Sequence, residues 1–463
     1  PAPWTLPVHA SLFTGLYPSQ HGADQENPYL EGATTLAETL SAAGYDTACY
    51  SSNAWITPYT HLTDGFDHQD NFFEVMPGDL LSGPLARAWK TMNDNERLRA
   101  IADKLVSLGN VAHEYFAGGE GADSKTPAVI DRTMTFLDDA DNSFAFINLM
   151  DAHLPYHPPE EFAAEFASGV DSADVCQNSK EYNAGARDID TEEWDAIRGL
   201  YDAEIAHIDD QLGRLFDWLK AEGRWDDTTV VVCADHGELH GEHDLYGHEF
   251  CVYDPLVNVP LFVKHPELDA DRRTDQVELV DLYHTVLDAL DVPASGPEGA
   301  VPLDPTRSLV SDSYREFAGL ADSDRDPGQR GDGEYAFVEY SRPVVELTQL
   351  EEKAAAAGID LPPDSRFYSR MRAARRVDAK YVRIDRIDDE AYRLDRDPGE
   401  TDDLAGDAAD DPAVAATESA LAEFESAAGG AWTDALGDAV SDDTVAEMDD
   451  EAKERLRDLG YLA

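Results

Sequence analysis

Three apolar runs, each followed at once by polar side chains, constrain the fold of this chain most strongly. The runs occupy residues 45–50, 143–150 and 228–234. Each has the length and composition of a buried strand. The polar side chains that follow them are Asn53, His153, Asp235 and His236. Because ligands of open α/β sheets bind beyond the carboxyl ends of the strands, we expect these four side chains to line one functional site.

Helical patterns alternate with the strands, which predicts an α/β fold with a mostly parallel sheet covered by helices on both faces. The predicted helices lie at 34–43, 194–219 and 276–292, with a further strand at 259–264. The helix at 194–219 carries apolar residues at steps of three and four, which is typical of an amphipathic helix. Residues 76–125 are interpreted as surface helices and loops.

The composition changes after residue 311, and 311–333 is interpreted as a surface connection. Short antiparallel strands are predicted within 335–340, 366–382 and 391–394, closed by the turn formers at 397–400. We therefore expect three parts: a catalytic α/β domain at 1–333, a C-terminal antiparallel α+β subdomain at 334–410, and a helical acidic tail at 411–463.

Near the start of the chain, Thr5 precedes a short helical pattern that Thr14 and Gly15 end. A hydroxyl at the beginning of a helix lies among unpaired backbone N–H groups, where the helix dipole favours anions. This is a suitable position for a nucleophile that attacks an anionic ester. The alternative is that Thr5 only caps the helix.

Asp235 and His236 are followed by Gly237 and Glu238, then by further acidic and histidine residues up to Glu249. A carboxylate and an imidazole side by side at a strand end suit a divalent cation. A hydrogen-bonded polar loop is the structural alternative. Likewise, Asn53 could be a turn former and His153 a structural histidine.

The chain holds 95 acidic against 35 basic residues, a net charge of −60. Such a surface repels nucleic acid and anionic membranes, so neither is an expected partner. It also suggests a halophilic protein with the acidic composition of such proteomes, stabilised by salt that screens its self-repulsion. The four cysteines show no paired spacing, which suits a reducing, cytoplasmic location. No apolar run approaches the roughly 20 residues of a membrane span.

The N-terminal segment resembles the signature of the sulfatase family, within the alkaline-phosphatase superfamily: Cys/Ser-x-Pro-x-Arg-Ala-Ser-x-x-Thr-Gly. The matching residues are Pro7, Ala10, Ser11, Thr14 and Gly15. Thr5 stands where sulfatases carry the Cys or Ser that becomes formylglycine, and His9 stands where they carry Arg. The continuation through Tyr17, Pro18, His21 and Gly22 is similar to the nucleotide pyrophosphatase/phosphodiesterase branch.

Other segments support this resemblance. The segment from Asp151 to Tyr156 is similar to the family's Asp-Pro-His-x-Pro-Tyr, whose histidine touches the bound ester. The segment from Asp235 to His243 is similar to its metal segment, and His248 falls where many sulfatases hold the ester with a lysine. Asn53 lies near the family's Gly-Lys-Trp-His-like substrate contact. Further matches are Lys380, Tyr381 and Asp397 to Glu400.

The resemblance implies a haloarchaeal-type member with an alkaline-phosphatase-like fold and a metal-dependent ester hydrolase activity. It makes Thr5 the nucleophile and a metal ligand, Asp235 and His236 further ligands, and Asn53 and His248 substrate contacts. His153 could protonate the leaving oxygen, and His9 completes the catalytic candidates. The expected substrate is a small anionic ester, a sulfated or phosphorylated glycan, lipid or metabolite. The metal could be Ca, Mg, Mn or Zn.

Two departures keep other functions open. Thr5 cannot become formylglycine, which favours phosphate diesters, phosphonates, or transfer of a phospho-headgroup to an acceptor, as in lipoteichoic-acid-synthase-like enzymes. The family also places an Asp-Asp pair on a strand upstream of the nucleophile, and the chain begins at Pro1 without it. We therefore expect an N-terminally truncated sequence with a metal site short of ligands. A non-catalytic binding relative is a further alternative.

Overall fold

The computed structural model describes residues 1–25, 27–71, 124–292, 297, 299–311 and 335–428. The chain forms two compact units. One unit contains Pro1–Ala43 and Asp226–Trp432, and the other contains Gly44–Trp225. Among these residues, no helix is both long and apolar enough to cross a bilayer. The expected elements within 72–123, 312–334 and 429–463 lie outside the described residues.

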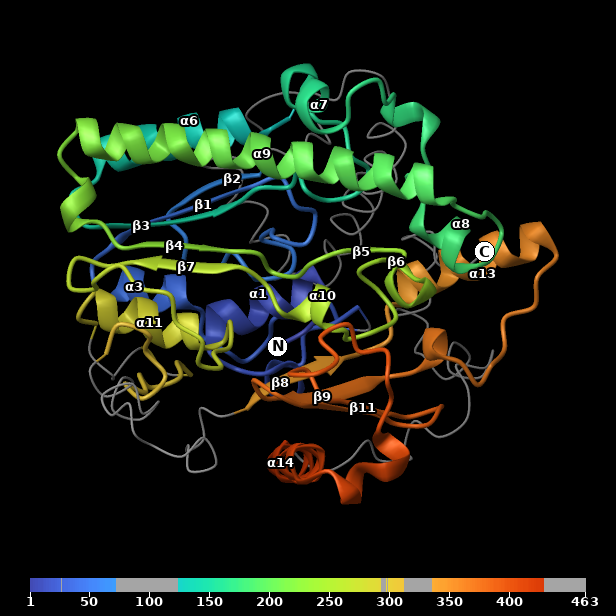
Figure 1. Ribbon diagram of the computed structural model, residues 1–463. Helices are drawn as coiled ribbons and strands as arrows, with labels where there is room; N and C mark the ends of the chain where they lie inside the picture. The colour runs from blue at the N-terminus through green and yellow to red at the C-terminus, as the bar shows by residue number, and fades with distance from the viewer. Residues whose placement is uncertain (26, 72–123, 293–296, 298, 312–334, 429–463) are drawn as a thin grey trace, which may run out of the picture. The chain divides into compact units, whose positions relative to one another are not determined.

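The unit of Gly44–Trp225 is built on a parallel sheet with the strand order β2-β1-β3. Its strands are β1 (Asp46–Ser51), β2 (His68–Asn71) and β3 (Ser143–Asn148). Helix α6 (Thr126–Asp139) packs on β1 and β3 and runs beside α9 (Thr191–Ala221) (Figure 1). Apolar side chains such as Tyr50, Val129 and Phe136 form the core between α6 and the sheet. The parallel arrangement brings the ends of β1 and β3 to one edge.

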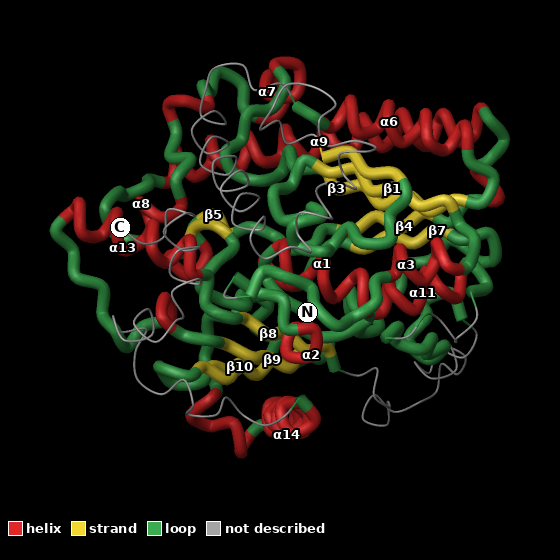
Figure 2. The backbone as a smooth tube through the Cα atoms, turned by 180° about the vertical axis from the view of Figure 1, so that it is seen from behind, coloured by secondary structure: helices red, strands yellow, loops and turns green. Residues whose placement is uncertain are grey.

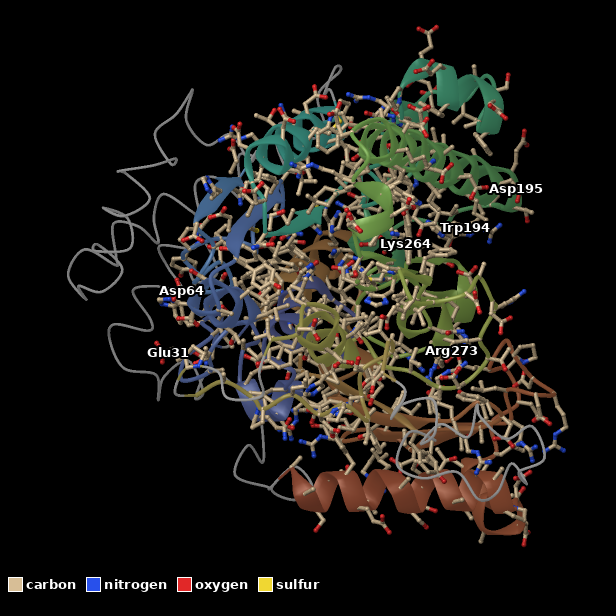
Figure 3. All side chains as sticks on the ribbon, turned by 90° about the vertical axis from the view of Figure 1, so that its left-hand side faces the viewer. Glu31, Asp64, Trp194, Asp195, Lys264 and Arg273 are labelled. Atoms are coloured by element: carbon tan, nitrogen blue, oxygen red, sulfur yellow. The ribbon has the colours of Figure 1, made fainter. Side chains whose placement is uncertain are left out.

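Helix α9 confirms the predicted amphipathic helix and extends it at both ends. Its N-cap Asp190 accepts a hydrogen bond from the Glu193 backbone N–H, which explains its start. Trp194 is buried against Tyr182, whereas the side chain of Asp195 is 72% exposed (Figure 3). Shorter helices α7 (Glu160–Phe166) and α8 (Ser179–Asn183) complete the unit.

The other unit begins with α1 (Thr5–Thr14), α2 (Pro18–His21) and α3 (Leu36–Ala42). Helices α1 and α3 pack together with α11 (Asp281–Ala289) (Figure 2). A two-stranded sheet joins β4 (Val230–Cys233) to β7 (Leu261–Lys264), and a hairpin joins β5 (Leu239–His240) to β6 (Tyr246–Gly247). Helix α10 (Asp254–Val257) lies between β6 and β7 in the chain.

The pairing of β4 with β7 is antiparallel, whereas the predicted sheet is mostly parallel. Parallel neighbours need a crossover of a dozen or more residues, usually a helix. Here the connection is filled by the β5–β6 hairpin and the short α10, so β7 returns beside β4 in the opposite direction. The predicted helix at 276–292 is also shorter than expected. The Glu278 N–H donates to Asp281 Oδ2 in a turn before α11, and Asp291 follows its end with a positive φ of 52°.

The expected C-terminal antiparallel sheet is present with the order β11-β10-β9-β8. Its strands are β8 (Ala336–Tyr340), β9 (Met371–Arg375), β10 (Lys380–Ile384) and β11 (Glu390–Tyr392). Helix α14 (Pro412–Ala427) packs along β9 and β10 through an apolar core that includes Tyr381 and Leu421 (Figure 2). Helix α13 (Val344–Ala357) lies between β8 and β9 in the chain.

Candidate active site

Helix α1 places Thr5 at its first residue. Trp4 is the N-cap in an extended conformation, so the side chain of Thr5 does not cap the helix. Gly15 ends it with φ 71°, where its N–H donates to the Ser11 carbonyl. A Cβ at Gly15 would lie 2.7 Å from the Tyr283 ring, so this end of α1 packs directly on α11.

Other motif residues around α1 fix the chain that follows it. The Ser11 hydroxyl lies 3.1 Å from His21 Nε2, and Ala23 N–H donates to His21 Nδ1 at 3.1 Å. Burial lowers the pKa of His21 to about 4, so this imidazole is neutral near pH 7. Tyr17 donates its hydroxyl hydrogen to Glu278 at 2.6 Å. These residues therefore serve as packing and hydrogen-bonding partners.

Asp235 and His236 follow β4 in a turn that leaves no room for a side chain at Gly237. A Cβ there would lie 1.9 Å from the Pro255 carbonyl oxygen, and the Gly237 N–H donates to the Leu256 carbonyl at 2.8 Å. Helix α10 thus supports the turn. The imidazole of His236 is set by a contact of 2.9 Å between Nδ1 and the Gly237 carbonyl oxygen. With the proton on Nδ1, the lone pair is on Nε2.

Four of the predicted residues meet in this unit. Thr5 Oγ1 lies 3.4 Å from His236 Nε2, and Asp235 Oδ2 lies 3.5 Å from the same nitrogen. His9, one helical turn after Thr5, places Nδ1 3.7 Å from Asp235 Oδ2 and 2.8 Å from the Thr5 carbonyl oxygen. A hydroxyl, an imidazole lone pair and a carboxylate oxygen therefore converge.

The charges of the cluster are set by burial and by its own members. Burial favours the neutral form of Asp235, but the neighbouring His236 and His9 outweigh it and lower the Asp235 pKa to about 2. Burial also lowers the pKa of His9, although Asp235 opposes this effect. Near neutral pH the cluster thus holds an ionised carboxylate beside a neutral, buried His9.

His248 lies against the same cluster. Its ring centroid is 4.3 Å from that of His236, and its Nδ1 lies 3.1 Å from Glu238 Oε1. Its Nε2 lies 3.9 Å from Glu249 Oε1, and both glutamate side chains are buried. The sequence interpretation gave no role to Glu238 or Glu249. The only signal in the sequence was that both glutamates lie close to Asp235 and His236. Buried acidic residues usually have a partner, and here that partner is His248.

Asn53 and His153 belong to the other unit, where they lie on adjacent loops at the sheet edge. Asn53 is buried, its Oδ1 accepts from the Trp55 N–H at 2.8 Å, and its Nδ2 lies 3.1 Å from Met150 Sδ. These contacts are those of a turn former, the structural alternative for this residue. His153 Nδ1 lies 2.5 Å from the Leu154 carbonyl oxygen, which places the proton on Nδ1.

A divalent cation fits the cluster in part. Asp235 supplies an ionised oxygen, His236 a nitrogen lone pair and Thr5 a hydroxyl oxygen, all donor types that such cations accept. Within the described residues, no group of three or more His, Cys, Asp or Glu side chains could hold a metal ion. The described residues would therefore hold such an ion only with further ligands from elsewhere. The four cysteines are all free.

Comparisons with known proteins agree with the motifs. A family model described as Sulfatase matches residues 1–292. The multifunctional alkaline phosphatase superfamily protein PehA of Trinickia caryophylli is 27% identical over 335 residues, which cover 61% of this chain and 63% of PehA. The uncharacterized sulfatase YidJ of Escherichia coli K12 is 26% identical over 313 residues, covering 63% of this chain and 59% of YidJ. The matches thus span less than two thirds of either relative.

Solved structures confirm the expected alkaline-phosphatase-like fold. The phosphonate monoester hydrolase of Agrobacterium radiobacter superposes with a TM-score of 0.57 at 21% identity, covering 92% of this chain and 86% of the hydrolase. BT4656, in complex with D-glucosamine-2-N,6-O-disulfate, gives 0.54 at 16% identity, covering 92% and 89% of the two chains. The family model matches well over half of the sequence, and this chain therefore belongs to the sulfatase family.

Proposed function

We propose that this protein hydrolyses small anionic sulfuric or phosphoric esters, with Thr5 as the nucleophile. The observation that carries the proposal is the approach of Thr5 Oγ1 to His236 Nε2 at 3.4 Å, beside the ionised Asp235. A threonine hydroxyl is a weak nucleophile until a neighbouring base or cation lowers its pKa. The lone pair of His236 lies where a base would accept the hydroxyl proton, and the charge of Asp235 lies where a cation would bind.

The other candidate residues receive roles from their chemistry. His9 is neutral and buried, and its contact with the Thr5 carbonyl oxygen fixes the first turn of α1 around the nucleophile. His248 would bind ester oxygens, with Glu238 and Glu249 holding its ring in place. His153 would protonate the leaving oxygen, and Asn53 would shape the substrate loop.

A divalent cation held by Asp235, His236 and Thr5 would lower the pKa of the threonine hydroxyl and polarise the ester. The choice among Ca, Mg, Mn and Zn is open in this proposal. Metal dependence is expected for a member of this family. The two conventional ligands among the described residues would by themselves make a weak site. We expect a chelator to lower both activity and melting temperature.

Phosphorus esters are the favoured substrates within this class. Thr5 cannot form the formylglycine hydrate by which sulfatases expel sulfate, so water must cleave a covalent Thr ester. The likeness to a phosphonate monoester hydrolase is compatible with this preference through the fold alone. If an acceptor alcohol replaces water in this step, the same site becomes a phospho-headgroup transferase.

The test compares two threonines of α1. The Thr14 hydroxyl donates to the Ala10 carbonyl at 2.7 Å and is buried, so Thr14→Val is a matched control for Thr5→Val. We expect Thr5→Val to lower kcat at least about 10³-fold, as loss of a nucleophile does, with little effect of Thr14→Val. The substrates are p-nitrophenyl sulfate, phosphate, phenylphosphonate and the bis-phosphodiester, with each metal.

Three outcomes separate the proposals. Turnover that Thr5→Val preserves would contradict the role of Thr5. Alkyl phosphate products in added alcohol, at the expense of free phosphate, would favour the transferase. No turnover of any ester with any metal, while glycan or lipid ligands still bind, would favour the non-catalytic alternative.

A further inference from the structure

The segment from Asp151 to His157, which carries His153, is held at its first residue by side chains of α6 and α9. Asp151 is buried, with a side chain only 6% exposed. Thr126, the first residue of α6, donates its hydroxyl hydrogen to Asp151 Oδ2. His207 on α9 places Nε2 3.6 Å from Asp151 Oδ1 and 3.0 Å from the Ser124 hydroxyl. Both carboxylate oxygens therefore have a partner from a helix.

The other end of the segment is held by side chains as well. Glu204, one helical turn before His207 on α9, accepts the His157 backbone N–H at 2.7 Å. The Gln177 side chain accepts from the Tyr156 N–H at 3.1 Å and donates to its carbonyl at 3.0 Å. Tyr156 itself is fully buried. The segment is thus anchored on both sides of His153.

His153 is oriented by the backbone of this segment. Its N–H donates to the Met150 carbonyl at 3.0 Å, and its Nδ1 contacts the Leu154 carbonyl oxygen. Because the ring is tied to the segment's own backbone, its direction depends on how the two ends are held. A displacement of about 1 Å in a reacting group can cost roughly 10²-fold in rate.

Burying polar residues at these positions lowers the stability of the fold. Glu204 is 3% exposed and His207 4% exposed, and burial raises the pKa of Glu204 to about 8. His207 Nδ1 is buried and has no hydrogen-bond partner among the described residues. Apolar side chains would avoid this desolvation cost. That these polar groups all hold the same short segment indicates a purpose beyond packing.

We propose that Thr126, Glu204 and His207 are positioning residues that orient His153 by holding both ends of the segment from Asp151 to His157. This inference rests on the proposed role of His153 as the group that protonates the leaving oxygen. It adds residues to the function that the sequence pattern did not single out, from two helices that carry no other candidate.

The test uses the full chain and isosteric pairs. Thr126→Val removes the hydroxyl that holds Asp151, whereas Thr133→Val removes a buried hydroxyl of the same helix that only donates to the Val129 carbonyl. Glu204→Gln keeps an oxygen for the His157 N–H, whereas Glu204→Met does not. Thr126→Ser restores the hydroxyl. Steady-state kinetics and hydrogen exchange of peptides covering residues 149–159 are measured for each.

We expect Thr126→Val and Glu204→Met to lower kcat about 10- to 100-fold with KM changed less than threefold, and to speed exchange in residues 149–159. Thr133→Val, Thr126→Ser and Glu204→Gln should stay within about threefold of the unmodified chain, since they keep the geometry that sets the rate. Unchanged kcat in Thr126→Val and Glu204→Met, with faster exchange, would reduce these residues to structural support and overturn the inference.

His153→Ala separates this inference from the role on which it rests. If His153→Ala leaves kcat unchanged, the role of His153 is wrong and the inference is overturned with it. If His153→Ala lowers kcat while Thr126→Val and Glu204→Met do not, only the positioning inference is overturned. Should Glu204→Met fail to fold, the Thr126→Val and Thr126→Ser pair decides the matter.

Discussion

Lys380→Met should destabilise the protein strongly and in a pH-dependent way. Lys380 is fully buried, with Nζ 2.7 Å from Glu400 Oε1 and 3.1 Å from Asp254 Oδ1. Arg375 Nη2 lies 2.8 Å from Asp254 Oδ2. These four residues, which we term the buried quartet, balance two positive and two negative charges. Burial favours the neutral form of Asp254, but Lys380 and Arg375 outweigh it and lower the Asp254 pKa to about 2.

Removing Lys380 leaves one buried carboxylate without a counter-charge. Protonation of Glu400 removes this unpaired charge at the lowest cost in free energy. Burial already raises the pKa of Glu400, with Lys380 opposing. Starting from its ordinary value of 4.5, adding that proton at pH 7 costs about 3.4 kcal/mol at 1.36 kcal/mol per unit. This agrees with the roughly 3–5 kcal/mol lost when one partner of a buried pair is removed.

The sign of the pH dependence follows from the same proton. In the variant the folded-state pKa of Glu400 lies above its unfolded value, so the protonated folded state is stable below about pH 4.5 and is lost as the pH rises. We therefore expect a penalty in the free energy of unfolding of about 1 kcal/mol at pH 5 and about 3 kcal/mol at pH 7.

Urea unfolding in concentrated KCl between pH 5 and pH 8 measures this penalty. Lys264→Met is the control, because Lys264 donates to the Thr228 carbonyl at 2.7 Å and does not belong to the buried quartet (Figure 3). That variant should lose about 1 kcal/mol at every pH. The double variant Lys380→Met, Glu400→Gln should recover most of the loss. A Lys380→Met penalty that is the same at pH 5 and pH 8, or that stays below 1 kcal/mol, would refute the reasoning.

Three further predictions concern stability. Gly15→Ala and Gly22→Ala both force alanine to a φ of +71°, which costs about 1–2 kcal/mol. Gly15→Ala should cost about 1–3 kcal/mol more in urea unfolding, since only its Cβ meets Tyr283, and equal costs would contradict this packing. The free energy of unfolding of Glu204→Gln should equal that of the unmodified chain near pH 4.5 and exceed it by up to about 4–5 kcal/mol above pH 8. The reason is that burial raises the pKa of Glu204 to about 8, so ionisation of this carboxyl destabilises the folded state increasingly as the pH rises between those values. Parallel pH profiles of the two proteins would refute this prediction. The melting temperature should rise with added KCl, given the net charge of −60, and a constant value would remove the halophilic interpretation.

Much of the local structure could be predicted because it depends on neighbours in sequence. The apolar runs became β1, β3 and β4, because a continuous run of such side chains favours a strand. The predicted burial of both faces holds for most of β1, whereas every residue of β3 and β4 is partly exposed. Gly15 ended α1 as expected, because glycine adopts the left-handed conformation without steric cost. The polar residues that follow these runs lie at the strand ends because the strands end close to where the apolar runs end.

The pairing and polarity of distant segments could not be predicted in the same way. Nothing in the run at 259–264 distinguishes an antiparallel partner of β4 from a parallel one, because burial periodicity is the same in both. Nor does sequence reveal that Glu238 and Glu249 flank His248, or that α9 presents Glu204 and His207 to the segment around His153.

The sequence by itself determined the family, the strand-end placement of the polar residues, and the acidic surface. Each of these three properties depends on the motif residues, the apolar pattern or the composition of the sequence. Each can therefore be recognised without knowing which residues meet across the core. Only the tertiary structure decided that Thr5, Asp235 and His236 converge and that Lys380 balances two buried carboxylates. The reason is physical: hydrogen bonds and charge pairs act over a few ångströms, and folding alone sets which residues come that close.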